Sequence, residues 1–292
     1  MSNLPLLSIN GLTAVSDRDG GAPILRDVSL KVMRGEVLGL VGESGAGKST
    51  IAKALLGILP RTIRVTGGSV LFEDRDLLTL PSRTLRQIIG NEIALIPQDP
   101  QTALNPGRRI EAQLTDGLRM KRGMSVRQAH ARAIALLEEV HIRDPLRVLK
   151  AYPHELSGGM RQRVLIAAAF SLEPKLVVAD EPTTALDVTV QKQILRLIRG
   201  MQDKHGTAVI FVTHDLGVVA QICDRVTLLY SGKVVEAGSC ADVLERPAHA
   251  YTAALLAASP RYDRPDAGLT PVPQAVFDQL RREIGTDARP NA

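Results

Sequence analysis

The segment Gly42–Ser49 places the strongest constraint on what this chain can fold into. It reads Gly-Glu-Ser-Gly-Ala-Gly-Lys-Ser and lies between the apolar run Val37–Val41 and a run with helical spacing that begins at Lys48. A GxxxxGK[ST] stretch at a strand-to-helix junction points backbone N–H groups and the positive end of a helix dipole at one place, which suits nucleotide phosphates. The alternative is a glycine-rich turn with an exposed lysine. In this setting the motif predicts an α/β fold with a nucleotide site.

Residues of this loop have separable roles in a phosphate site. The glycines let the backbone turn around the phosphates, Lys48 would bridge the β- and γ-phosphates, and Ser49 would ligate Mg²⁺. The residues expected to contact the nucleotide are Gly42, Glu43, Ser44, Gly45, Ala46, Gly47, Lys48, Ser49 and Thr50.

Hydrophobic patterning divides the rest of the chain into three parts. The opening third predicts short strands at Leu7–Val15, Ile24–Val32, Val70–Phe72 and Ile93–Ile96, with a short helix at Leu80–Ile89. Residues from about 107 to 170 carry helical spacing and no convincing strand, which indicates a helical subdomain. Strands and helices then alternate, which predicts a mainly parallel sheet flanked by helices. The predicted strands are Leu176–Ala179, Ala208–Val212 and Val226–Tyr230, and the predicted helices between them are Val190–Met201 and Leu216–Ile222.

The C-terminal part begins with a predicted hairpin at Ser231–Lys233, followed by short helices near Cys240–Glu245 and Tyr251–Ala258. From Arg261 onward the chain contains four prolines and balanced charges. We expect residues 261–292 to form a loosely ordered tail.

Two acidic residues follow the apolar strand Leu176–Ala179. A carboxylate at the carboxyl end of a parallel strand lies where a nucleotide site forms, so Asp180 suits Mg²⁺. Glu181, one residue later, is placed to polarise an attacking water as a general base. The alternative is that both acids are a solvated strand end.

A second anion site is indicated at Leu156-Ser-Gly-Gly-Met160, which precedes the helical run Val164–Phe170. Ser157 can cap this helix, with its hydroxyl and the amides of Gly158 and Gly159 facing outward. One nucleotide cannot readily use two helix N-termini so far apart in one chain. Ser157 is therefore expected to serve a nucleotide held by another subunit, although plain capping is the alternative.

At these residues the chain resembles the ATP-binding subunits of ABC transporters. The order matches over about Leu6–Tyr262: phosphate loop, Gln98 after a strand, the Leu156–Met160 signature, Asp180-Glu181, the Thr184–Asp187 loop, then His214. The resemblance implies an ABC ATPase cassette over residues 6–260: a P-loop NTPase core with a mainly parallel sheet, an N-terminal antiparallel β subdomain and an inserted helical subdomain at about 107–170. It also implies ATP and Mg²⁺ as cofactors.

The resemblance carries roles over to particular residues. Gln98 would sense Mg²⁺ and the attacking water, His214 would contact the γ-phosphate, and Asp187 would lie at the seam of a dimer. Catalysis would then rest on Glu181, His214 and Gln98, and Mg²⁺ on Ser49, Gln98 and Asp180. A buried glutamine in a turn, or a lone histidine after a strand, would otherwise be structural.

Further stretches are similar to the dipeptide, oligopeptide and nickel importer branch: Gln98-Asp-Pro100, Leu104-Asn-Pro106, Tyr152–Leu156, Asp180–Val188 and Arg246–Thr252. The resemblance implies two integral membrane permease subunits, a second cassette in a homodimer or heterodimer, and indirectly a substrate-binding protein. The expected location is peripheral, at the cytoplasmic face of the inner membrane. No apolar run reaches the length of a membrane span, and Met1–Pro5 lacks a signal-peptide pattern.

The chain departs from the family at two points. Members of the family usually place an aromatic residue near the first strand, where it stacks on adenine, but no aromatic residue precedes Phe72 here. Adenine must therefore be held otherwise, and Arg18 or Val15 is expected to cover it. No cysteine follows Cys240, so no iron–sulfur site is expected.

Net charge bears on the competing function. The formal charge is +5, and Arg108–Lys150 holds ten Lys/Arg against five Asp/Glu, which accounts for the whole excess. This fits a solvated helical face better than a nucleic-acid surface, because aromatic residues for base stacking are few and sustained heptads are missing. We expect no nucleic-acid partner. A soluble cassette acting on nucleic acid or ribosomes is the alternative function, and a phosphate-loop kinase would leave the Ser157 signature unexplained.

Overall fold

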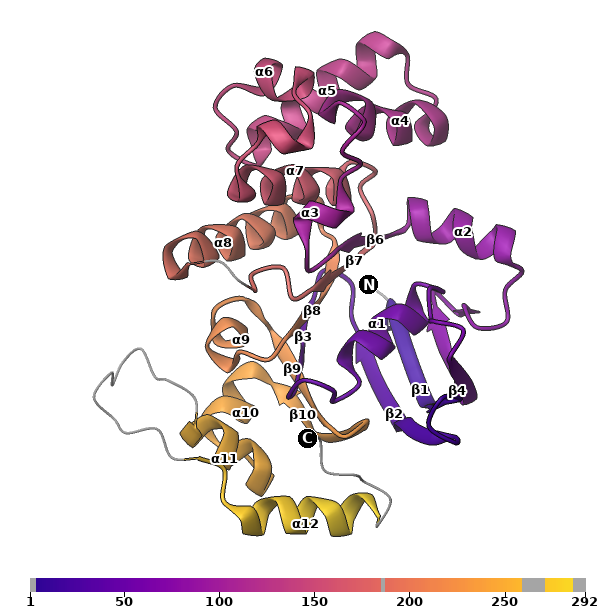
Figure 1. Ribbon diagram of the computed structural model, residues 1–292, viewed down its shortest axis with the longest axis vertical. Coiled ribbons are helices and arrows are strands. Elements are labelled where there is room, and N and C mark those ends of the chain that lie inside the picture. The colour runs from indigo at the N-terminus through magenta and orange to yellow at the C-terminus, as the bar shows by residue number, and fades with distance from the viewer. Residues whose placement is uncertain (1–3, 185–186, 259–270, 286–292) are drawn as a thin grey trace. The chain divides into compact units, whose positions relative to one another are not determined.

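The computed structural model describes residues 4–184, 187–258 and 271–285 (Figure 1). The chain divides into two compact units, one formed by residues 1–85 and 210–292 and the other by residues 86–209. It passes from one unit to the other within α2 (Ser82–Asn91) and β8 (Ala208–Thr213). Among the residues just given, no helix is both long enough and apolar enough to cross a membrane.

An antiparallel sheet occupies the N-terminal part of the first unit. Its strand order is β2-β1-β4-β5, with bounds β1 (Leu7–Ser16), β2 (Ala22–Val32), β4 (Ile63–Phe72) and β5 (Arg75–Asp76). Leu7, Ile9, Leu12 and Ala14 of β1 are fully buried, and the residues between them reach the surface. Alternating burial of this kind is what one packed face of a sheet requires. The predicted N-terminal antiparallel subdomain is confirmed.

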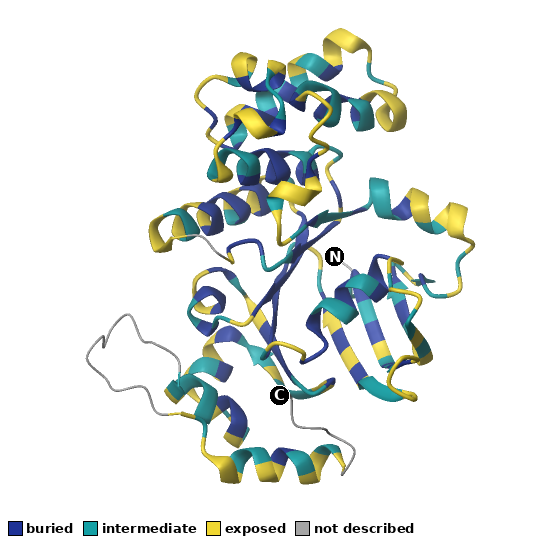
Figure 2. Cartoon of the chain, in the orientation of Figure 1, coloured by how far each residue is buried: buried dark blue, intermediate teal, exposed yellow. Residues whose placement is uncertain are grey.

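The core strands of the first unit pair in parallel where the sequence predicted it. β3 (Val37–Val41) pairs in parallel with β9 (Arg225–Tyr230), and β9 pairs antiparallel with β10 (Lys233–Ser239). All five residues of β3 are buried, as in a strand covered on both faces (Figure 2). The helices of this part are α1 (Lys48–Leu55), α9 (Leu216–Ile222) and α10 (Cys240–Glu245).

The predicted hairpin joins β9 to β10. Tyr230 pairs with Lys233, so the turn holds only Ser231 and Gly232, with φ values of 47° and 80°. Positive φ at both positions is typical of the two-residue turns that match the twist of paired strands. Gly232 donates its N–H to the carbonyl of Ala46 at 3.0 Å, which ties this turn to the phosphate loop.

The second unit combines a parallel strand pair with helices. β6 (Ile93–Ile96) pairs in parallel with β7 (Leu176–Asp180). The chain between these strands is helical, which confirms the predicted inserted subdomain: α3 (Pro100–Ala103), α4 (Ile110–Arg122), α5 (Val126–Glu139), α6 (Pro145–Lys150), a 3-10 turn at Pro153–Glu155 and α7 (Gly158–Phe170). α8 (Val188–His205) follows β7.

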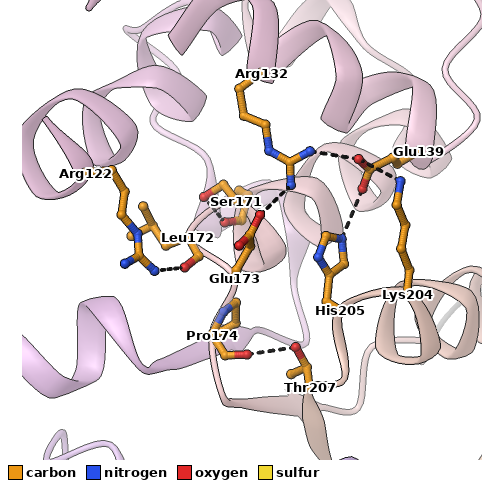
Figure 3. A network of polar contacts seen from close by, with 11 residues as sticks. Arg122, Arg132, Glu139, Ser171, Leu172, Glu173, Pro174, Lys204, His205 and Thr207 are labelled. Atoms are coloured by element: carbon orange, nitrogen blue, oxygen red, sulfur yellow. Dashed lines mark hydrogen bonds and ion pairs between the residues drawn. The ribbon is translucent and has the colours of Figure 1, made fainter. Parts of the chain in front are cut away.

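A polar network joins the end of α5 to the end of α8 within this unit (Figure 3). The Glu139 carboxylate lies 2.9 Å from Arg132 Nη1, 3.0 Å from Lys204 Nζ and 3.2 Å from His205 Nε2. Burial would raise the pKa of Glu139, but hydrogen bonds from Lys204, His205 and Arg132 outweigh burial and hold the pKa below its usual value. Two helices separated in sequence are thereby cross-linked through one carboxylate.

The expectation of a loosely ordered tail is wrong for residues 274–284. They form α12 (Gln274–Ile284), which packs near α11 (Ala250–Ala258). Leu280 is fully buried and the Phe277 ring lies 6.2 Å from that of Tyr230, so tertiary burial stabilises a helix that proline content argued against. Residues 261–270 and 286–292 of the predicted tail lie outside the described residues.

Candidate nucleotide site

The phosphate loop connects β3 to α1 through backbone conformations that only glycine adopts without strain. Gly42, Gly45 and Gly47 have φ values of 156°, 81° and 98°. A Cβ on Gly42 would lie 2.3 Å from the carbonyl oxygen of Leu229, and one on Gly47 would lie 2.7 Å from Leu25 Cδ2. The glycines of the motif are therefore required both by the turn and by close neighbours.

Lys48 is buried inside this loop. Its Nζ donates to the carbonyl oxygens of Gly42 at 2.7 Å and Glu43 at 2.8 Å, and only 4% of the residue is exposed. The alternative of an exposed lysine after a glycine-rich turn is therefore wrong. Two carbonyl acceptors fix the ammonium in direction, which is the arrangement needed to present a positive charge to a phosphate group. Ser49 and Thr50 follow in the first turn of α1 and are half-buried.

In the second unit, the acidic pair lies at the end of β7. Asp180 is the last residue of the strand, and Glu181 follows with φ 46°, a left-handed conformation that is rare outside glycine. Gln98 Nε2 donates to Glu181 Oε2 at 3.3 Å, and Thr184 Oγ1 donates to the same oxygen at 2.9 Å. Gln98 is exposed, so it is not the buried structural glutamine of the alternative reading.

Sequence reasoning missed the residue that anchors the loop after Glu181. Gln162, on α7, is 1% exposed and its Nε2 donates to the carbonyl of Pro182 at 2.8 Å. A buried amide needs such partners, so Gln162 fixes the backbone next to the acidic pair. The sequence carried no local signal for this role, because Gln162 lies between Arg161 and Arg163 at the polar start of the helix.

Ser157 is the N-cap of α7, as predicted, and its Oγ accepts a hydrogen bond from the Met160 N–H at 3.3 Å. Ser157 and Gly158 are exposed, and a Cβ on Gly158 or Gly159 would meet nothing within 4 Å. Packing among the described residues thus does not explain the two glycines. Their open surface leaves room for a group from outside this helix to approach its N-terminus.

Two further predicted residues lie at exposed helix starts. Asp187 is the N-cap of α8, and its carboxylate accepts from the Val190 N–H at 2.9 Å, a role that sequence reasoning did not assign. His214 is exposed between the end of β8 and Asp215, which caps α9. Ala185 and Leu186 of the same loop as Asp187 lie outside the described residues.

The predicted site residues are thus distributed over both units. The loop from Gly42 to Thr50 and His214 belong to the first unit, whereas Gln98, Ser157, Asp180, Glu181 and Asp187 belong to the second. Within the described part of the chain, no group of three or more His, Cys, Asp or Glu side chains could hold a metal ion. Of the residues expected to cover adenine, Arg18 is exposed in the turn after β1 and Val15 is half-buried.

Two family models match this chain. One, described as ABC transporter, matches residues 25–184, which span the phosphate loop, the signature and the acidic pair. The other, described as the C-terminal region of oligopeptide/dipeptide transporters, matches residues 235–285 and so includes α11 and α12.

Curated relatives are identical to the chain at 44–49% of the aligned positions. A probable D,D-dipeptide transport ATP-binding protein of Escherichia coli K12 is 49% identical over 88% of this chain and 79% of that protein. The oligopeptide transport ATP-binding protein of Salmonella typhimurium is 44% identical over 98% of this chain and 85% of that protein. A peptidoglycan transport ATP-binding protein of Agrobacterium fabrum is 48% identical over 89% of this chain, which spans only 48% of that longer protein.

Solved structures show the same fold. A dimeric, post-hydrolysis ATP-binding cassette, MJ0796, bound to ADP and Pi, has a TM-score of 0.70 and 26% identity, covering 80% of this chain and 98% of that one. The cbiO1 protein of Clostridium perfringens has a TM-score of 0.71 and 26% identity, covering 89% and 96%. These likenesses confirm the fold class and the resemblance, and they lend no support to the nucleic-acid alternative. The chain belongs to the ABC transporter family and folds as one of its ATP-binding cassettes.

Proposed function

We propose that the chain is the ATP-hydrolysing subunit of a bacterial importer for dipeptides, oligopeptides or a related small solute. The observation that carries the proposal is the pairing of Gln98 with Glu181, residues 83 apart in sequence, at the end of β7. A carboxylate fixed by an amide and a hydroxyl is suited to accept a proton from water in a defined direction. Peptide transport rests on what the relatives are named for, not on any residue of this site.

In the proposed reaction, Glu181 accepts a proton from water as the water oxygen bonds to the γ-phosphorus of ATP. The bond between that phosphorus and the oxygen bridging to the β-phosphate breaks, so ADP leaves and inorganic phosphate is formed. Lys48 and His214 stabilise the negative charge that develops on the transferred group. The amide nitrogen of Gln98 donates to Glu181, and the amide oxygen of the same side chain is a kind of ligand that a hard cation accepts. The hydroxyl of Ser49, the carboxylate of Asp180 and the Gln98 amide oxygen are ligands that Mg²⁺ prefers, and Mg²⁺ would neutralise phosphate charge there.

The exposed helix start at Ser157, Gly158 and Gly159 leads us to propose that each ATP pocket is shared between two cassettes. The loop Gly42–Thr50 of one chain and Ser157, Gly158 and Gly159 of another would close on one ATP, with Asp187 at the seam. Closing and reopening would move two integral membrane permease subunits, served by a separate binding protein. The chain would work at the cytoplasmic face of the inner membrane, either with a copy of itself or with a different cassette.

Substitution of the proposed base tests the chemistry. Glu181→Gln should retain ATP binding, lower kcat by about 10²- to 10⁴-fold, and accumulate closed dimers in the presence of ATP. Glu138→Gln, which changes an exposed carboxylate at the end of α5 in the same unit, is the matched control and should keep wild-type turnover. Undiminished turnover in Glu181→Gln would remove this residue from the role of base.

Mixing two inactive variants tests the shared pocket. A dimer of Lys48→Ala with Ser157→Arg contains one pocket with an intact loop and an intact signature if pockets are shared. Activity should therefore return in the mixture. If each pocket were built within one chain, the mixture would stay as inactive as either variant.

Co-purification with two integral membrane proteins, rather than with ribosomes, would test the transport role.

A further inference from the structure

Three aromatic rings connect the C-terminal helices to the strand beside the phosphate loop. Tyr230 is the last residue of β9, and its ring meets that of Tyr251, on α11, at a centroid distance of 5.1 Å and an interplanar angle of 62°. The ring of Phe277, on α12, lies 6.2 Å from that of Tyr230. Tyr251 is fully buried. The region matched by the model of oligopeptide/dipeptide transporter C-termini is thus packed into the first unit through these rings.

The end of the strand that carries Tyr230 lies against the phosphate loop itself. The carbonyl of Leu229, next to Tyr230, approaches Gly42 so closely that a Cβ there would lie 2.3 Å from it. Burial is the first cause that raises the pKa of Tyr251 and of Tyr230, and the negative charge of Glu43 is the second for both. Glu43 is thus the charged residue that acts on both phenols.

Glu43 also holds the lysine of the loop. Its backbone carbonyl accepts from Lys48 Nζ at 2.8 Å and from the Ala46 N–H at 3.1 Å. The Tyr251 hydroxyl is buried and has no partner that meets full hydrogen-bonding geometry among the described residues, although the charge of Glu43 and a hydrogen-bonding interaction with its side chain both raise the pKa of Tyr251. A carboxylate accepts strongly from a phenol, so a small movement of Glu43 would satisfy both groups.

The start of α11 is fixed independently of this contact. The Tyr251 N–H donates to Nδ1 of His249 at 3.1 Å, and Nε2 of His249 lies 3.0 Å from the carboxylate of Glu283 on α12. The N–H of His249 donates to Glu236 of β10 at 3.1 Å. Contacts with β10 and α12 hold His249, two residues before Tyr251, in place. The position of the Tyr251 phenol is therefore fixed independently of the phosphate loop.

We propose that Tyr251 is a positioning residue for ATP binding: its hydroxyl engages the Glu43 side chain when the phosphate loop surrounds the nucleotide, and so sets the direction of Lys48. This inference rests on the proposed role of the loop in binding ATP. It gives the C-terminal region a role in the site that sequence motifs alone do not assign, since Tyr251 lies 208 residues after Glu43.

The test compares Tyr251→Phe with Thr252→Val in the full chain. Thr252 is the next residue of α11, is fully buried, and also has a hydroxyl without a partner among the described residues, so its variant controls for loss of a buried hydroxyl. Binding of a fluorescent ATP analogue is measured directly, since the chain contains no tryptophan to interfere. We expect Tyr251→Phe to raise the Kd on the order of tenfold, the loss of one hydrogen bond to a charged group, while Thr252→Val leaves it unchanged.

Steady-state kinetics separate positioning from damage to the fold. Tyr251→Phe should raise the KM for ATP with little change in kcat, whereas a smaller folded fraction would lower kcat at constant KM. In a Glu43→Ala background, the Tyr251→Phe substitution should have no further effect on Kd, as a double-mutant cycle requires of one interaction.

Three results would overturn the inference: an unchanged Kd in Tyr251→Phe, an equal rise in Thr252→Val, or an effect of the same size when Glu43 is alanine. Failure of the wild-type chain to bind the ATP analogue would instead contradict the proposed function.

Discussion

Gly232 offers a direct measure of how tightly the β9–β10 turn is joined to its surroundings. Its φ is 80°, and a Cβ would lie 2.1 Å from the carbonyl oxygen of Ile24. Its own N–H donates to Ala46 and its carbonyl accepts from the Arg26 N–H at 2.8 Å. A methyl group at this position must therefore move backbone, because no flexible side chain is available to give way.

The cost of Gly232→Ala has two parts. A left-handed conformation costs a residue with a Cβ about 1–2 kcal/mol, and displacing packed neighbours adds about 1–3 kcal/mol. Gly206→Ala isolates the first part, because Gly206 has φ 62° at the end of α8 and a Cβ there would meet nothing within 4 Å. The difference between the two variants, about 1–3 kcal/mol, corresponds to roughly 2–10 °C in Tm.

Thermal and urea unfolding followed by circular dichroism measure this difference. Gly232→Ala should have the lower Tm of the two variants and should also bind the fluorescent ATP analogue more weakly, because the turn no longer holds Ala46 of the phosphate loop. Gly206→Ala should bind it as the wild type does. Equal Tm values for both variants would refute the reasoning, since they would show that the contact with Ile24 carries no cost.

Two further predictions concern the second unit. Asp187→Ala should lower the free energy of unfolding by about 1 kcal/mol because α8 loses its N-cap, whereas Asp187→Asn, which keeps a capping oxygen, should stay within a few tenths of the wild type in urea unfolding. The capping role would be contradicted if the free energy of unfolding fell less in Asp187→Ala than in Asp187→Asn. Glu139 has a pKa in the folded chain below its ordinary 4.5, so its stabilising effect is present above that pH and is lost as the pH falls through the lower folded value. The stability of the wild type relative to Glu139→Gln should therefore shrink between about pH 6 and pH 3 in urea unfolding, and a constant difference across this range would contradict the assignment.

Features with a local physical cause were predictable from the sequence. The helices Leu216–Ile222 and Cys240–Glu245 have the predicted bounds, and Ser157 caps its helix as expected. Capping, turn formation and the glycine requirement of the phosphate loop depend on a few neighbouring residues and their backbone angles. Those rules operate before any distant part of the chain is in place.

The helix α12 shows where composition misled the prediction. Prolines and balanced charges indicated a loose tail, yet Phe277, Leu280 and Ile284 recur at helical spacing, a signal that was present within the sequence. Such a short segment gains most of its stability from burial against other elements, and its burial partners, Tyr230 among them, lie outside it.

The sequence by itself determined the glycine-rich loop, its lysine, the acidic pair, the signature serine and the family to which they point, because each is a short pattern with its own backbone chemistry. Only the tertiary structure decided that Gln98 and Thr184 contact Glu181, that Gln162 anchors the loop after it, and that Tyr251 packs against Tyr230. These contacts depend on which side chains burial brings together, and no spacing along the chain encodes that.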